Sequence, residues 1–279
     1  MNPINPGAEH SRLDYADTVA PGDSPASITN NPAANAIHWM PTVARIPSLK
    51  LLVRPEGLTG ADDSAIAAWA DDSGNGNSLA QATALNKPVL KTGIIEGMSI
   101  ARFDGTNSFM ATDAANTVPD GQPLTILAVA SLLDTSGSVR LCGHNQASAG
   151  YGAGFDGNDG RFTTLGIADH TVADSVPAGS FQLFGFSFDS GFDFSFYRNG
   201  TLIGTDTTGS QDAAATASAF RLGAAKDADT KFIGDVAEFI VCSAILSATE
   251  RQMIEGYLAW KYGLEANLPS DHPYRNTPL

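Results

Sequence analysis

Alternating hydrophobic and polar residues recur along the chain from Ile46 onward. A period of two is typical of strands with one buried face. The clearest example joins two phenylalanine-rich runs through the turn Asp189-Ser190-Gly191. Asn199-Gly200 then predicts a two-residue hairpin turn into the next strand. We therefore expect a mainly β protein, in which the phenylalanines of this hairpin mostly point into the core: Phe184, Phe186, Phe188, Phe192, Phe194 and Phe196.

One helix is predicted among many strands. Further strands are expected over 48–53, 65–70, 99–103, 124–133 and 233–242, and the run 124–133 is apolar enough to be buried on both faces. Ser247 and Glu250 have the spacing of a capping box, and Gly263 stands where a helix from 247 to 262 would end. Many strands with one late helix predict a β-sandwich with a helix packed on it.

Charge and composition argue against some classes of binding partner. The 279 residues include 16 Lys+Arg against 30 Asp+Glu, a formal net charge of −14. Nucleic acid and anionic membrane surfaces attract basic proteins, so neither is expected as a main ligand. No apolar run is long enough to span a bilayer, and the first residues lack a secretory signal. Cys142 and Cys242 lie in apolar segments, which predicts two buried free thiols.

Residues 1–45 differ from the rest of the chain, which we assign to one sandwich domain over 46–279. Six of the 15 prolines lie between Pro3 and Pro41, and apolar periodicity is absent before Ile37. Such a segment cannot fold alone. It is either a flexible tail or an extended arm that becomes ordered on a partner, and we favour the arm. Its candidate apolar anchors are Ile28, Ile37, Trp39, Met40 and Val43.

Motifs of known chemistry are mostly missing. There is no Gly-x-Ser-x-Gly and no His-Glu-x-x-His. Gly152–Gly157 matches Gly-x-Gly-x-x-Gly, but no helix signal follows it, which favours a glycine-rich β-loop. Asp235 and Glu238 are three apart on a strand and should face opposite sides, so they do not form the carboxylate pair of a glycosidase. Carboxylates from separate strands could still converge. We expect no catalytic residues.

The segment Asp71–Asn77 is the best candidate site. Asp71, Ser73 and Asn75 occupy positions 1, 3 and 5 of a calcium-loop pattern, with Gly76 at position 6. The twelfth position, which needs a bidentate Glu, is Ala82. The alternative is a tight loop whose polar side chains bond their own backbone. The missing ligand favours the tight loop, so we expect no metal and no cofactor.

Several segments resemble the concanavalin A-like, laminin-G-like sandwich domains of bacterial and phage proteins. They are Ala68–Asn77, Ala101–Gly105, Tyr197–Gly200 and Gly234–Val241, followed by 246–264, Leu268-Pro269 and His272-Pro273-Tyr274. The resemblance covers about Ile46 to Tyr274 and implies a jelly-roll β-sandwich. Glycanases of that group carry an acidic strand motif that this chain lacks, so the resemblance favours a non-enzyme. We expect His272, Pro273, Tyr274, Trp260 and Tyr262 to be structural.

These observations favour a non-enzymatic protein of a virion surface. It would be a capsid decoration, a head fibre or a receptor- or glycan-binding module, anchored to capsid or tail proteins by residues 1–45. Self-association and binding to a cell-surface glycan are further expectations. The alternatives are a glycan-active hydrolase or lyase on a jelly-roll fold, and a carbohydrate-binding module of a bacterial adhesin.

Overall fold

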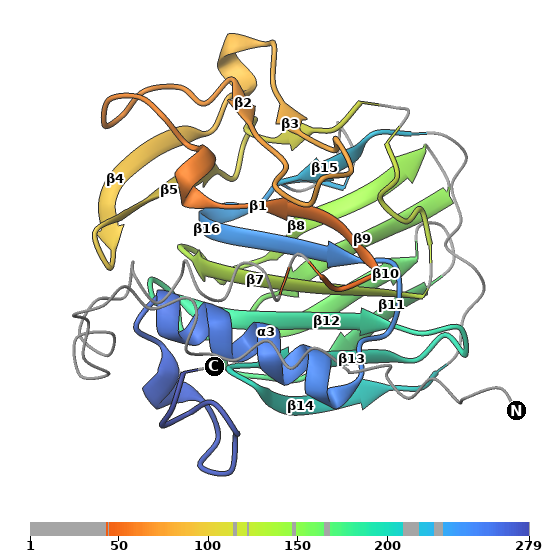
Figure 1. The fold of residues 1–279 in the computed structure, drawn as a ribbon. Coiled ribbons are helices and arrows are strands. Elements are labelled where there is room, and N and C mark those ends of the chain that lie inside the picture. Colours follow the sequence, from red (N-terminus) through yellow and green to blue (C-terminus); the bar gives the residue numbers. More distant parts are fainter. Residues whose placement is uncertain are drawn as a thin grey trace, which may run out of the picture.

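The computed structural model describes residues 43, 45–113, 116–121, 123–146, 149–164, 168–208, 218–225 and 231–278. They form two antiparallel sheets of eight strands each, packed face to face, with one long helix, α3 (Ala248–Lys261), in front of one sheet (Figure 1). This architecture confirms the predicted sandwich. Of the proposed arm anchors, Ile28, Ile37, Trp39 and Met40 lie outside the described residues.

The sheet beneath the helix is called the helix-side sheet here. Its strands run in the order β14-β13-β12-β7-β16-β5-β4, and β1 pairs with β16 beside this path. The predicted strands over 48–53, 99–103, 124–133 and 233–242 all lie in it. Its members are β1 (Leu49–Val53), β4 (Val89–Ile95), β5 (Met98–Asp104), β7 (Leu124–Leu132), β12 (Gln182–Phe188), β13 (Phe194–Arg198), β14 (Thr201–Asp206) and β16 (Ile233–Cys242).

The second sheet is called the far sheet. Its order is β11-β10-β9-β8-β15-β6-β3-β2. Its strands are β2 (Ala68–Trp69), β3 (Leu79–Ala80), β6 (Met110–Ala111), β8 (Ser138–Gln146), β9 (Ala149–Asp156), β10 (Asp159–Thr164), β11 (Ala168–Val172) and β15 (Phe220–Leu222). Short 3-10 helices are η2 (Pro55–Gly57), η3 (Ala84–Asn86) and η4 (Glu265–Asn267).

A layer of phenylalanine rings joins the two sheets. Phe155 of the far sheet meets Phe184 of the helix-side sheet at 4.8 Å between ring centroids, and Phe162 stacks on Phe188 at 4.4 Å. The core prediction for the aromatic hairpin is confirmed, because five of its six phenylalanines are fully buried. Phe192 packs partly buried at the edge of the core, where its φ of 71° belongs to the turn.

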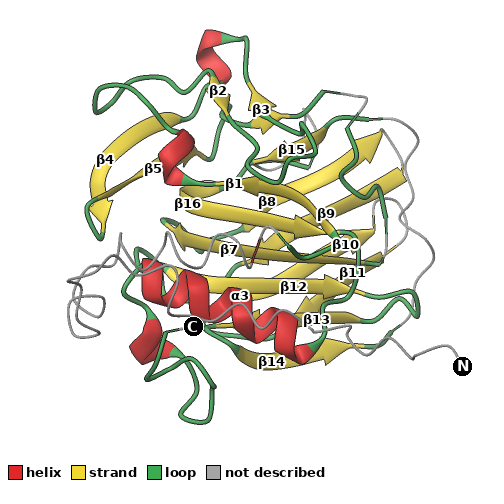
Figure 2. Cartoon of the chain, in the orientation of Figure 1, coloured by secondary structure: helices red, strands yellow, loops and turns green. Residues whose placement is uncertain are grey.

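The helix α3 covers the outer face of the helix-side sheet (Figure 2). Ser247 and Glu250 form the predicted capping box, and Gly263 has a left-handed φ of 63° just after the helix. Val43 is fully buried in the cluster beneath the helix, so this part of the sandwich begins before Ile46. Other members of that cluster are Leu52, Leu127, Val129, Leu183, Ile240, Ile254, Tyr257 and Leu258.

The segment after the helix returns onto it, as expected. The indole Nε1 of Trp260 donates to the carbonyl of Tyr274 at 2.7 Å, and buried His272 lies 3.2 Å from a carboxylate oxygen of Glu255. Tyr262 is buried as well. In the described part of the chain, no helix is long and apolar enough to cross a membrane.

Both cysteines are free and buried, which confirms that prediction. Burial raises the pKa of the Cys242 thiol to about 12 and displaces the pKa of Cys142 upward as well. Neither side chain is a thiolate at neutral pH, so neither is an activated nucleophile.

The prediction for Asp235 and Glu238 is wrong, because β16 contains a bulge. Its register against β7 shifts between Val236 and Glu238, which makes Ala237 an extra residue. Glu238 therefore faces the helix, where it bonds Lys261. Asp235 points to the same outer face, where Arg102 holds it through two hydrogen bonds of 2.7 and 2.8 Å.

The phenylalanine layer predicts where an added methyl group disrupts the core. A Cβ on Gly160 of β10 would lie 2.4 Å from a ring carbon of Phe196, whereas a Cβ on exposed Gly137 would meet nothing within 4 Å. Gly160→Ala is expected to lower the free energy of unfolding by about 1–3 kcal/mol through overpacking. Gly137→Ala, the matched control, is expected to leave it nearly unchanged. Urea unfolding of both variants measures this, and equal stabilities would contradict the packing.

Candidate ligand-binding groove

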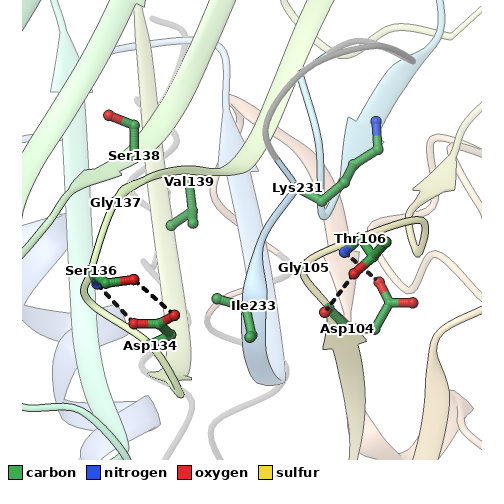
Figure 3. Close-up of a pocket in the computed structure, with 10 residues that line it drawn as sticks. All are labelled: Asp104, Gly105, Thr106, Asp134, Ser136, Gly137, Ser138, Val139, Lys231 and Ile233. Atoms are coloured by element: carbon green, nitrogen blue, oxygen red, sulfur yellow. Dashed lines mark hydrogen bonds between the residues drawn. The ribbon is translucent and has the colours of Figure 1, made fainter.

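A groove of about 250 Å³ opens at one rim of the sandwich (Figure 3). Three segments far apart in sequence line it: 104–106 at the end of β5, residues of 134–139 leading into β8, and Lys231 and Ile233 at the start of β16. The sheet register brings them together, since Ile233 pairs with Asp104 and Gly234 pairs with Leu132. We call this feature the rim groove.

The rim groove combines apolar and polar surface. Figure 3 shows the side chain of Ile233 between Asp134 and Asp104, with Val139 beside it and Lys231 extending away from both carboxylates. Hydroxyl groups come from Thr106, Ser136 and Ser138. The groove thus presents hydrogen-bonding groups on either side of an aliphatic centre.

The Asp104 carboxylate is held by the turn that follows it. Its Oδ1 accepts hydrogen bonds from the backbone N–H groups of Thr106, Asn107 and Ser108 at 2.8–2.9 Å, and from the Ser108 hydroxyl at 2.9 Å. Partial burial acts to raise the pKa of Asp104, but these hydrogen bonds outweigh it and the pKa is lowered. Asp104 is therefore ionised at neutral pH and its orientation is fixed.

Asp134 is held in a similar way on the opposite side. The backbone N–H of Ser136 donates to its Oδ1 at 2.8 Å, and the Ser136 hydroxyl donates to its Oδ2 at 3.0 Å. These bonds lower the pKa of the Asp134 carboxyl. Both carboxylates of the groove are thus acceptors, whereas glycoside hydrolysis needs a carboxylic acid that still carries its proton.

Two further groups of the lining, Lys231 and Ser138, are held by neighbouring residues. The Lys231 ammonium lies 5.2 Å from the centroid of the Phe109 ring, and Lys231 itself is buried. The Ser138 hydroxyl accepts a hydrogen bond from Arg161 at 2.9 Å and donates one to the Asp156 carboxylate. The groove thus offers carboxylate acceptors on either side of an aliphatic side chain, which suits a ligand with hydroxyl groups and an apolar ring face.

The Asp71–Asn77 segment is the tight loop that the sequence favours. Oδ1 of Asp71 accepts from the backbone N–H groups of Leu52 and Ser73 at 3.0 and 2.9 Å. Its Oδ2 accepts from the Ser73 hydroxyl and from the Asn77 N–H, both at 2.8 Å. The carboxylate therefore fastens the loop to β1. Among the described residues, no group of three or more His, Cys, Asp and Glu side chains could hold a metal ion.

Gly152–Gly157 is not a loop throughout. Most of it lies in strand β9, and only Gly157 belongs to the turn into β10. A Cβ on Gly154 would lie 2.2 Å from the carbonyl oxygen of Val139 on the neighbouring strand. These glycines permit close packing of the strands within the far sheet. The strand β10 follows the motif, whereas a dinucleotide-binding site requires a helix at that position.

The sequence indicated only one part of the rim groove. Asp104-Gly105 was predicted as the turn that ends a strand, but Asp134, Ser136 and Lys231 belong to no recognised motif. Only the pairing of β16 with β5 and β7 brings them together.

The loop geometry makes a prediction about calcium. Because the Asp71 carboxylate already accepts four hydrogen bonds from its own loop and β1, millimolar Ca²⁺ is not expected to raise the melting temperature beyond the effect of equal Mg²⁺. Asp71→Ala is expected to cost about 2 kcal/mol, since it leaves buried donors unpaired. Thermal melting with each ion, and urea unfolding of the variant, measure this. A rise of several degrees specific to Ca²⁺ would reveal a bound ion.

Comparison with solved structures supports the fold. The binding domain of Paraclostridial mosquitocidal protein 1 superposes with a TM-score of 0.56 at 12% identity, covering 76% of this chain and 52% of that one. Domain 4 of AbnA, an extracellular arabinanase of Geobacillus stearothermophilus, described in complex with arabinotriose, gives 0.52 at 16% identity, covering 73% and 96%. A Trypanosoma rangeli sialidase gives 0.53 at 13% identity, covering 84% and 39%.

The chain spans about half the length of the mosquitocidal binding domain. It matches no curated protein. A family model described as "Concanavalin A-like lectin/glucanases superfamily" matches residues 104–250, which include most strands of both sheets and every residue that lines the rim groove. The chain is a member of the concanavalin A-like lectin/glucanase superfamily.

Proposed function

We propose that this chain is a non-catalytic glycan-binding module whose ligand occupies the rim groove. The observation that carries the proposal is the pair of fixed, ionised carboxylates, Asp104 and Asp134, on either side of Ile233. Sugar hydroxyls donate to carboxylates, and the C–H face of a sugar ring packs on aliphatic side chains. The volume of about 250 Å³ lies below the range of about 300–1,000 Å³ for drug-sized ligands, which suits one or two sugar units.

The carboxylates elsewhere support binding rather than hydrolysis. Asp235 and Glu238 share a face, but each is committed to a structural partner, Arg102 and Lys261. Asp104 and Asp134 have lowered pKa values, so neither retains a proton for a leaving group at neutral pH. A glycan ligand agrees with the structural relatives, which include a protein named as a binding domain and an arabinanase domain described in complex with arabinotriose. Because a sialidase is also among the structural relatives, glycan hydrolysis is the alternative function to test.

The proposal extends to the biological setting. We place the protein on a virion surface, as a capsid decoration, head fibre or receptor-binding module. The proline-rich segment before Val43 would attach it to capsid or tail proteins, with self-association of the attached copies. The net charge of −14 would keep free copies soluble before attachment. Val43, the first of the described residues, is buried beneath the helix.

Binding to an oligosaccharide panel tests the groove. We expect at least one neutral oligosaccharide to bind, without release of reducing ends. Gly137→Trp adds bulk at a position that lines the groove and has open space around its Cα, so it is expected to weaken binding by about tenfold or more, equivalent to about 1.4 kcal/mol. Ala61→Trp, at an exposed position outside the groove lining, is the control.

Calorimetry and a reducing-end assay measure the two parts of this prediction. If neither the native chain nor the control binds any oligosaccharide, the glycan proposal fails. Binding that Gly137→Trp leaves intact would place the ligand elsewhere, and turnover would favour the hydrolase.

Attachment is tested by removing residues 1–42. Because Val43 stays, the shortened chain is expected to keep the free energy of unfolding of the full chain and its glycan affinity, but to be lost from purified virions. Urea unfolding and immunodetection on particles measure these outcomes. Incorporation equal to that of the full chain would show that the segment is not an anchor.

A further inference from the structure

A lysine and two glutamates meet beneath the helix α3. The Lys261 ammonium lies 2.7 Å from Oε2 of Glu238 on β16 and 3.0 Å from Oε1 of Glu56 in η2. The Lys261 side chain is 1% exposed and that of Glu238 is 0% exposed, whereas Glu56 reaches solvent at 49%. The three groups come from segments far apart in the chain, so the fold itself assembles them.

The surroundings of this cluster are aromatic. The Lys261 nitrogen lies 5.5 and 5.4 Å from the ring centroids of Tyr257 and Tyr262. The Tyr262 hydroxyl donates to Oε2 of Glu238 at 2.8 Å. Oε1 of Glu238 is buried without a hydrogen-bond partner in the described part of the chain. An ion pair with one unsatisfied oxygen is a costly state inside a protein.

We propose that Lys261 and Glu238 condense into an amide that covalently joins α3 to β16. The Lys261 nitrogen forms a bond to Cδ of Glu238, and the bond from Cδ to Oε1 breaks. The ammonium gives up two protons, and both end on Oε1, which departs as water. No oxidant, reductant or other reactant is needed, because one carboxylate and one ammonium become one amide and one water.

Two neighbouring groups contact the reacting pair. The Glu56 carboxylate touches the lysine nitrogen, so it can take its protons and pass them to the leaving oxygen. The Tyr262 hydroxyl, already bonded to Oε2, stabilises the charge that develops there when the nitrogen adds to the carboxyl carbon. The pKa of Tyr262 is raised by burial and by Glu238, so it keeps its proton.

The product removes the cost of the buried pair. An amide carries no charge, and the unsatisfied Oε1 is gone. The bulge at Ala237 sets the geometry, since it turns Glu238 toward the helix. A link between positions 238 and 261 would also restrict the unfolded chain, as other cross-links do.

Intact mass spectrometry of the denatured full chain tests the proposal. The expected mass is lower than the sequence mass by one water, and digestion is expected to yield a branched peptide joining position 238 to 261. Lys261→Met is expected to have its full sequence mass. Glu238→Gln is expected to lose one ammonia instead of one water, because an amide acceptor releases ammonia.

A native chain at full sequence mass with no branched peptide overturns the proposal, whatever the variants do. A water loss that persists in Lys261→Met, or that maps to an Asp-Gly step such as Asp104-Gly105, also overturns it. The native measurement requires no variant to fold, and it is independent of glycan binding.

Discussion

The packing of phenylalanine rings between the two sheets is the constraint on which the rest of the structure depends. The rings from β12 and β13 need space that only glycine leaves on the facing strand, as Gly160 does beneath Phe196. The same pairing recurs between the sheets where Gly223, after β15, lies against the ring of Phe103 of β5. A sequence with 14 Phe and 28 Gly is therefore suited to a thin sandwich with a dense aromatic centre.

The phenylalanine rings fill the space between the inner faces of the two sheets. The outer face of the helix-side sheet is covered by other parts of the same chain. The helix, Val43 and Ile46, and the returning C-terminal segment occupy the outer face of the helix-side sheet. The β16 bulge contributes by directing Glu238 to Lys261 across this interface. The rim groove, the site that we propose for a ligand, lies apart from this covered face, where segments from both sheets meet.

Local sequence signals were sufficient for the elements that depend on neighbouring residues. The capping box at Ser247, the Asn199-Gly200 turn and the alternating phenylalanines each act over a few residues, and each is confirmed. The β16 bulge was missed because strand alternation assumes two residues per repeat, and nothing near Ala237 signals an extra one. The rim groove was missed because register, not local sequence, brings Asp104, Asp134 and Lys231 together.

The central claim is that the rim groove, rather than the helix-covered face or the Asp71–Asn77 loop, receives a glycan. Hydrogen–deuterium exchange of the full chain, with and without its best-binding oligosaccharide, tests this by location. The account predicts slower exchange on binding in the loops 104–108, 134–139 and 231–233, with unchanged exchange in α3. Protection confined to α3 or to residues 71–77 would contradict it.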